Sequence, residues 1–146
     1  TVTHPEIISE VFSADTLCMV AAPGHPLAAN RTVTLADAAS CPLLLREPGS
    51  AGREIVESLF LSGGIQIAPV WESVSTLALI RAAQNGLGIA ILPELLVRDA
   101  LKSGDLVSLP LSPDILTRNL YLIRHRNKYL SSSAEEFLNL CRMWKF

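Results

Sequence analysis

The stretch that decides the fold is residues 41–64, CPLLLREPGSAGREIVESLFLSGG. It begins with a short apolar run, continues through the polar residues 46–50, and ends in a helical pattern that Gly63 and Gly64 terminate. The residues expected on the inner face of this helix are Ile55, Val56, Leu59 and Phe60. A buried strand followed directly by an amphipathic helix is the repeating unit of a parallel α/β sheet.

The same alternation continues on both sides of this unit, which favours an α/β fold. Extended segments are expected at 16–22, 65–71, 87–92, 106–109 and 119–124. Further helices are expected to begin near residues 34, 76, 94 and 133. Thr34 is expected to cap the first of these, and Pro93 to occupy the first position of the third.

Two of these helices carry specific side-chain predictions. The helix that ends at Asn85-Gly86 is expected to turn Leu77, Ile80 and Ala83 inward. The last helix is expected to open with a capping box at Ser133 and Glu136. Its predicted inner face consists of Phe137, Leu140, Cys141 and Trp144.

Composition excludes several classes of protein. The chain has 146 residues, of which 49% are hydrophobic, and 14 acidic against 12 basic residues give a net charge of −2. Such a chain can bury a core without disulfides or metal, so disorder is excluded. No apolar run approaches the ~20 residues of a membrane span. A pI of about 5.9 argues against nucleic-acid binding by this segment, because DNA-binding domains are typically basic.

The cysteines indicate the cellular compartment of the protein, and the first residues indicate whether the sequence is a fragment. Cys18, Cys41 and Cys141 are odd in number, far apart and set in apolar sequence, which predicts small buried side chains and a reducing cytoplasm. The chain starts at Thr1 without Met and without a secretory signal, so we expect it to be a fragment of a longer protein.

Motifs for catalysis are missing from the sequence. It contains no G-x-S-x-G elbow, Walker loop, G-x-G-x-x-G, H-E-x-x-H or C-x-x-C pattern. Gly86-Leu-Gly88 lies between a helix and a strand, which indicates a helix stop and not a dinucleotide loop. We therefore expect no catalytic residue, metal site or cofactor.

Two polar loops are the strongest candidate binding site. The segments 47–50 and 72–76 each follow an apolar strand and open a helix, so both lie where open α/β sheets bind ligands. Ser50 in the first, and Ser73 or Ser75 in the second, would expose backbone N–H groups toward an anion. The alternative is that these serines only cap their helices.

Glu47 and Glu72 occupy equivalent places in the two loops. If both carboxylates face the ligand, a cationic or hydroxyl group beside a carboxylate would suit the site. The alternative is that Arg46 neutralises Glu47 at the surface.

An ordered series of short motifs extends over nearly the whole chain. The series is GHPLA at 24–28, VTLAD at 33–37, PLLLR at 42–46, GSAGR at 49–53, ESVST at 72–76, GLGI at 86–89 and Leu92-Pro93. No single motif is specific, but the ordered series resembles the effector-binding domain of LysR-type transcriptional regulators. The predicted effector-binding residues of the two polar loops are Glu47, Gly49, Ser50, Glu72, Ser73, Val74, Ser75 and Thr76.

The resemblance implies a type 2 periplasmic-binding-protein-like α/β fold, in which two subdomains joined by crossing strands hold a small effector between them. Residues 23–115 would then form one complete subdomain. Residues 1–22 would be a remnant of the other subdomain with the first crossing strand, and residues 116–146 the second crossing strand and its C-terminal helix. We expect these remnants to expose apolar surface.

The function implied is sensing of a small anionic or zwitterionic effector by a homo-oligomeric, cytoplasmic regulator, usually a tetramer. Binding would shift the population of conformations, and DNA would be bound by an N-terminal helix-turn-helix outside this segment. One alternative is a solute-binding protein of a transporter with the same fold. The other is an acyl-transfer enzyme using a loop serine, for which the sequence offers no base.

Overall fold

The computed structural model describes residues 4–112 and 117–144, which belong to two compact units. One unit is Thr16–Leu116, and the other combines Thr1–Asp15 with Thr117–Phe146. The long strand β1 (Ile7–Ala21) contributes its first half to one unit and its second half to the other.

The larger unit is built on a mixed sheet in the order β4-β3-β5-β1-β6. Strand β3 runs parallel to β4 and β5, whereas β1 runs antiparallel to β5 and β6. Strands β2 and β7 form a separate parallel pair. The bounds are β2 Val33–Thr34, β3 Leu43–Arg46, β4 Trp71–Ser73, β5 Ile89–Pro93, β6 Val107–Ser108 and β7 Leu111–Ser112.

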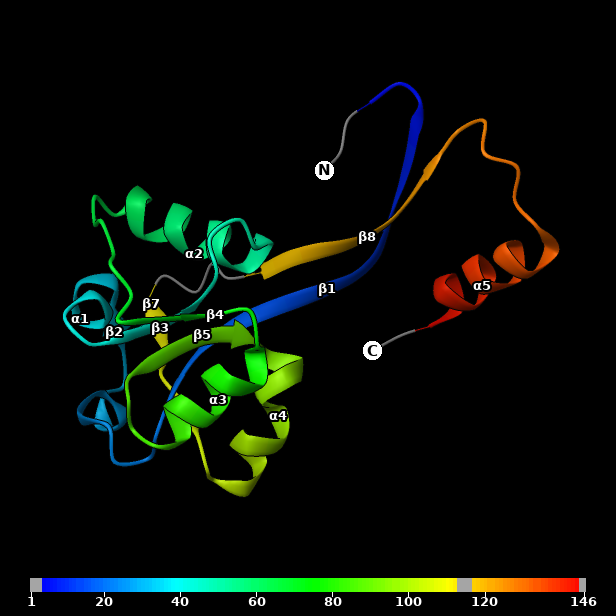
Figure 1. Ribbon diagram of the computed structural model, residues 1–146. Helices are drawn as coiled ribbons and strands as arrows, with labels where there is room; N and C mark the ends of the chain where they lie inside the picture. Colours follow the sequence, from blue (N-terminus) through cyan, green and yellow to red (C-terminus); the bar gives the residue numbers. More distant parts are fainter. Residues whose placement is uncertain (1–3, 113–116, 145–146) are drawn as a thin grey trace. The chain divides into compact units, whose positions relative to one another are not determined.

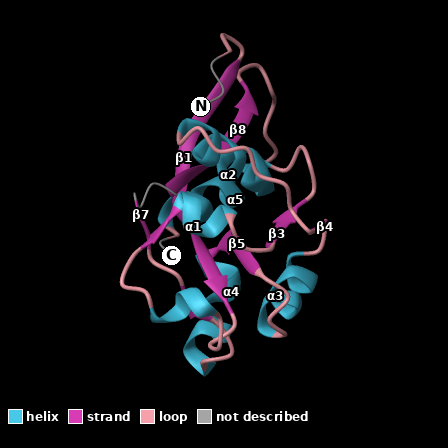
Figure 2. Ribbon diagram, turned by 90° about the vertical axis from the view of Figure 1, so that its left-hand side faces the viewer, coloured by secondary structure: helices cyan, strands magenta, loops and turns pink. Residues whose placement is uncertain are grey.

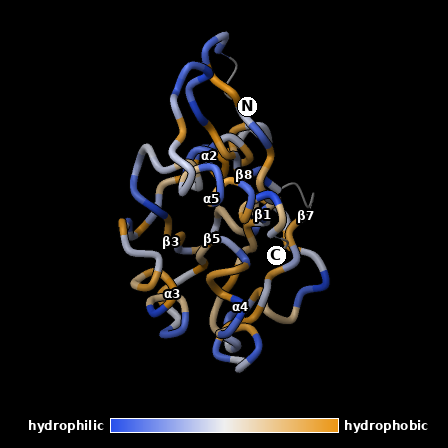
Figure 3. Tube along the Cα trace, turned by 90° about the vertical axis from the view of Figure 1, so that its right-hand side faces the viewer, coloured by the Kyte–Doolittle hydropathy of each residue, from blue (hydrophilic) through white to orange (hydrophobic). Residues whose placement is uncertain are grey.

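Helices cover both faces of this sheet (Figure 1). Alternate residues of β3 point to opposite sides, so Leu43 and Leu45 pack with α1 and α2 while Leu44 packs with α3 and α4. Hydrophobic and hydrophilic residues alternate along α4, as expected for a helix on the surface (Figure 3). The helices are α1 Leu35–Ala39, α2 Ala51–Ser62, α3 Thr76–Gln84 and α4 Glu94–Ser103, preceded by a 3₁₀ turn at Pro26–Ala29.

The predicted α/β alternation is confirmed in this unit. The apolar runs at 41–45 and 87–92 supply β3 and β5, the two central parallel strands. Thr34 caps α1 in a complete capping box with Asp37, and the hydrogen bonds from Thr34 lower the pKa of Asp37.

The strand predicted at 65–71 is wrong. Strand β4 is only Trp71–Ser73, so the candidate residues Glu72 and Ser73 lie in a strand and not in a loop. Ile65 and Ile67 still pack against the core, but their backbone is not part of the sheet. Pro69 explains part of this, because a proline has no N–H to donate to a neighbouring strand.

Two helix details are also wrong. Pro93 is the N-cap of α4 and ends β5, so it does not occupy the first helical turn. Leu77 is 63% exposed. The buried residues of α3 are Leu79, Ile80, Ala82 and Ala83.

The glycines near residue 87 serve two different purposes. Gly86 has φ +74 directly after α3, which confirms the predicted helix stop. Gly88 allows close packing, because a Cβ there would lie 2.3 Å from the carbonyl oxygen of Pro42. That oxygen accepts a hydrogen bond from the Ile89 N–H at 2.8 Å.

The smaller unit contains the first half of β1, strand β8 (Thr117–His125) and helix α5 (Ser132–Met143). Strand β8 pairs with β1. Arg118 forms an ion pair with Asp15 at 2.6 Å, and Arg142 of α5 forms one with Glu10 at 2.7 Å. The N-cap of α5 is Ser131, whose side chain accepts from the Ala134 N–H, so the predicted capping box at Ser133 is wrong.

Helix α5 has no fully buried residue, which overturns its predicted inner face. Cys141 is partly buried, and the exposed apolar residues of the helix end are Phe137, Leu140, Met143 and Trp144. The expected exposure of apolar surface in this part of the chain is thereby confirmed.

None of the helices in the described part of the chain has the length and apolar character that a membrane span requires.

Candidate functional site

The register of β3 and β4 brings the two candidate segments together. These parallel neighbours pair Leu45 with Glu72 and Arg46 with Ser73, so both end at the same edge of the sheet (Figure 2). The segment 47–50 then leads into α2, and the segment 74–75 into α3. The predicted adjacency of the two loops is confirmed.

Both candidate capping serines do cap helices. Ser50 Oγ accepts from the Arg53 N–H at 3.2 Å, and Ser75 Oγ accepts from the Ala78 N–H at 3.3 Å. Ser73 Oγ accepts from the Ser75 N–H at 3.1 Å, which shapes the turn between β4 and α3. Gly49 adopts φ +84, a conformation that glycine reaches at little cost.

Arg53 holds the two candidate segments together through its hydrogen bonds. Its side chain is buried, and its Nη1 donates to the Arg46 carbonyl oxygen at 3.0 Å and to Glu72 Oε1 at 2.9 Å. Its Nε donates to Glu57 Oε1 at 2.7 Å within α2. One guanidinium therefore ties α2 to the carboxyl ends of both β3 and β4.

Arg46 links the two loops at the surface. Its Nε and Nη2 donate to the two carboxylate oxygens of Glu47 at 2.8 and 2.9 Å, and its Nη1 donates to Thr76 Oγ1 at 3.2 Å. The side chains of Arg46 and Glu47 are 30% and 31% exposed. The hydrogen bonds from Arg46 hold the pKa of Glu47 below its ordinary value, so this carboxylate is charged at neutral pH.

Each candidate carboxylate already has an arginine partner. Glu47 pairs with Arg46, and Glu72 pairs with Arg53. The structure therefore favours neutralisation of both carboxylates by arginine over their binding a cationic group of the ligand. Val74 is exposed. The site offers guanidinium, hydroxyl and backbone N–H donors, which is the chemistry that binds an anion.

The sequence reasoning did not select Arg46 or Arg53 as site residues. The i,i+4 spacing of Arg53 and Glu57 was a usable signal for an ion pair. The contacts of Arg46 with Thr76 and of Arg53 with Glu72 cross 30 and 19 residues, and no local pattern indicates them.

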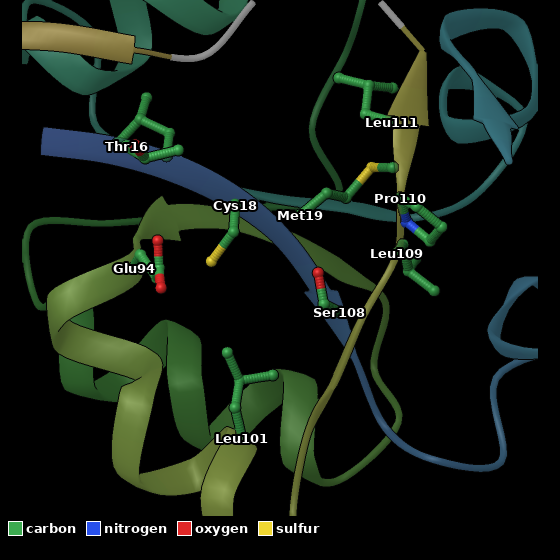
Figure 4. Close-up of a pocket in the computed structure, with 10 residues that line it drawn as sticks. Thr16, Cys18, Met19, Glu94, Leu101, Ser108, Leu109, Pro110 and Leu111 are labelled. Atoms are coloured by element: carbon green, nitrogen blue, oxygen red, sulfur yellow. The ribbon is translucent and has the colours of Figure 1, made fainter. Parts of the chain in front are cut away.

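A separate pocket of about 400 Å³ lies between β1, α4 and the segment 108–111, and no candidate residue lines it (Figure 4). The Cys18 sulfur points toward the space between Glu94 and Leu101, and it donates to the Leu92 carbonyl oxygen at 3.6 Å. Cys18, Cys41 and Cys141 are thiols outside any disulfide and are only partly buried, so the prediction of buried cysteines is wrong in degree. Among the described residues, no three His, Cys, Asp or Glu side chains gather as a metal site requires.

The sequence matches a known family along almost its full length. The family described as LysR substrate binding domain matches residues 1–145. The HTH-type transcriptional regulator YeiE of Escherichia coli strain K12 is 40% identical over 136 residues, which are 93% of this chain and 46% of YeiE. The chain thus spans just under half the length of this relative.

Solved structures show the same fold. The regulatory domain of CcmR from Synechocystis PCC6803, in complex with 2-PG, aligns with a TM-score of 0.85 at 23% identity, covering 97% of this chain and 70% of that one. The effector-binding domain of QuiR in complex with shikimate aligns with a TM-score of 0.82 at 23% identity, covering 97% and 66%.

Proposed function

Because the chain belongs to the family of LysR substrate-binding domains, we propose that it senses a small anionic metabolite and couples its binding to DNA recognition elsewhere in a transcription regulator. Its fold is the type 2 periplasmic-binding-protein-like α/β fold that the sequence predicted. The relatives named above support a regulator and give no support to the alternative of a transporter's solute-binding protein.

One observation carries the choice of ligand and site. The ends of β3 and β4 bring the donors of Arg46, Thr76 and the two capped loops to one edge of the sheet. The two related domains were solved with 2-PG and with shikimate, and shikimate is a carboxylate. We therefore propose that the eight predicted residues line the effector site and that Arg46 contacts the anion, and we favour an anion over a zwitterion.

The proposed mechanism is a population shift. Residues 23–115 would act as one of two subdomains, and the effector would bind one arrangement of them better than another. The difference between those two affinities limits how strongly effector binding can change DNA binding. We expect no covalent step, because the donors of the site offer binding without a nucleophile and base.

The remaining parts of the proposal concern partners. We assign DNA binding to a helix-turn-helix outside this chain, because YeiE is about twice as long and is named an HTH-type regulator. The exposed apolar end of α5 supports burial against further parts of the same protein or in a dimer or tetramer. A regulator of this kind would act in the cytoplasm.

A thermal-shift screen of metabolites against the protein that carries this chain tests the proposal. An anionic effector at about 100 times its Kd should stabilise the protein by about 2.7 kcal/mol. Arg46→Gln should abolish most of this stabilisation. The matched control, Arg81→Gln, removes the same charge from the exposed side of α3 and should keep it. Equal stabilisation of both variants, or no response to any organic anion, would contradict the proposal.

A further inference from the structure

We propose that Glu47 is an internal stand-in for the anionic group of the effector, which displaces it from the guanidinium of Arg46. The inference rests on the proposed function and adds a specificity rule to it. A ligand must bind Arg46 better than Glu47 does. Arg46 and Glu47 are neighbours in the sequence, but the Glu47 carboxylate contacts the Arg46 guanidinium in the way that a bound carboxylate ligand would.

The Arg46–Glu47 contact uses one donor edge of the guanidinium, the edge formed by Nε and Nη2. Nε and Nη2 each donate to a different oxygen of the Glu47 carboxylate, at 2.8 and 2.9 Å. This two-point arrangement is the one that arginine also forms with free carboxylates and phosphates. An oxyanion that binds through this Nε–Nη2 edge needs the same two donors, so it and Glu47 exclude each other there.

The third nitrogen of Arg46 keeps the guanidinium in position during such an exchange. Nη1 donates to Thr76 Oγ1 at 3.2 Å, and Thr76 is the first residue of α3. The guanidinium is therefore fixed to the second loop independently of Glu47. An oxyanion that replaces Glu47 would meet an arginine that is already oriented.

Arg53 shows why Arg46 is the arginine that can exchange its partner. Arg53 is 5% exposed, and its donors are engaged by a carbonyl oxygen and by two carboxylates from different elements. Releasing it would leave a buried charge without partners, which is strongly destabilising. Arg46 and Glu47 are both about one-third exposed, so solvent or a ligand reaches the pair without unfolding.

The strength of the pair suits a displaceable contact. Ion pairs at this exposure contribute little net free energy, because water screens them and replaces the lost partner. Once displaced, Glu47 would return to solvent as a hydrated carboxylate. The arrangement selects ligands with two adjacent anionic oxygens, such as a carboxylate or phosphate, over monatomic anions such as chloride.

The experiment follows the Arg46 side chain by NMR while inorganic phosphate is added at neutral pH. The probe signal is the ¹⁵Nε–¹Hε resonance of Arg46, identified by its loss in Arg46→Gln. We expect Glu47→Gln to bind phosphate about two- to fivefold more tightly than the parent, the factor by which an exposed ion pair competes. Chloride should shift the resonance far less than phosphate in this variant.

Glu57→Gln is the matched control, because it removes the same charge from a carboxylate that faces Arg53 and not Arg46. If both variants tighten phosphate binding equally, the effect is general electrostatics and the inference is overturned. It is also overturned if Glu47→Gln shows no phosphate-dependent shift or the same Kd as the parent. Circular dichroism of each variant confirms that it is folded.

The outcome is separable from that of the proposed function. Equal phosphate affinities in all variants, together with a metabolite whose stabilisation needs Arg46, would refute the stand-in and leave effector sensing intact. Tighter phosphate binding by Glu47→Gln, together with a metabolite screen in which nothing stabilises the protein, would do the reverse.

Discussion

Among the residues that the structure describes, Arg53 is the only charged residue that is buried, at 5% exposure. A buried arginine is tolerated only when its donors are satisfied, and here they reach α2, β3 and β4. The side chain thus fixes the positions of the two loops that form the proposed effector site. Arg53 therefore orders these two loops as well as stabilising the folded protein.

Replacing this arginine should therefore destabilise the protein. Arg53→Met keeps the apolar stem but removes the donors, and the loss should be about 1.5–3 kcal/mol, typical of hydrogen bonds to charged groups. Loss of a fully buried pair would cost more, but Glu57 and Glu72 are 48% and 41% exposed and water can solvate them. Urea unfolding measures the change. Glu57→Gln should cost less than about 1 kcal/mol, and equal losses would contradict the anchoring role.

Gly88 provides a second residue-scale prediction. Alanine at this position would place Cβ against the Pro42 carbonyl and disturb the entry to β5, so Gly88→Ala should cost at least about 1–3 kcal/mol. Gly24 is the matched control, because a Cβ there meets nothing within 4 Å. Gly24→Ala should change the free energy of unfolding by less than about 0.5 kcal/mol. Thermal unfolding of both variants decides the matter, and similar melting temperatures would refute the packing argument.

Single residues were predictable where the signal is local. Thr34, Ser50 and Ser75 cap helices as the sequence indicates, because a cap depends on residues within three positions. The partners of Arg46 and Arg53 depend on which strands become neighbours. That information is contained in the tertiary pairing of β3 with β4 and not in either segment alone.

Helix α5 tests capping at the scale of an element. Ser131 accepts from the Ala134 N–H, whereas Ser133 lies within the first turn. Ser131→Ala should destabilise the helix by about 1 kcal/mol, and Ser133→Ala should have a much smaller effect. Hydrogen exchange of the α5 amides is the suitable measurement. The opposite order of protection would favour the capping box at Ser133 that the sequence suggested.

The Glu10–Arg142 pair links α5 to β1 and depends on pH. Hydrogen bonds from Arg142 lower the pKa of Glu10, so the folded state favours the ionised carboxylate. The contribution of the pair is therefore fully present above the unfolded-state pKa of about 4.3 and is lost as the pH falls through the lower folded value. In a ¹³C NMR titration, Arg142→Gln should raise the pKa of Glu10, and Arg142→Lys should raise it less. An unchanged pKa in Arg142→Gln would show that the pair does not form.

The order of elements was predictable in the larger unit, and the errors have physical causes. Continuous apolar runs gave β3 and β5, because strands buried on both faces need no polar alternation. Strand β4 lies at the sheet edge and is three residues long, so its pattern is dominated by the polar site residues. In α3, two alanines supply half of the buried face, and Leu77 is exposed to solvent. A prediction that looks for large apolar residues therefore places Leu77 on the buried face by mistake.

At the scale of the whole molecule, the family and the fold were predictable from an ordered series of weak motifs. The assignment of residues 23–115 and of the flanking segments to two subdomains stays a prediction. The described residues of the smaller unit contribute none of the fully buried hydrophobic side chains. We propose that further sequence of the kind present in the longer relatives covers the exposed end of α5.

The central claim is that an anionic effector binds at the paired ends of β3 and β4. Hydrogen–deuterium exchange of the protein that carries this chain, with and without an anion selected by thermal shift, tests it most directly. The account predicts slower exchange in peptides that cover residues 46–53 and 72–79, and loss of this protection in Arg46→Gln. Protection confined to the pocket lined by Cys18, Glu94 and Leu101, with residues 46–53 and 72–79 unchanged, would contradict it.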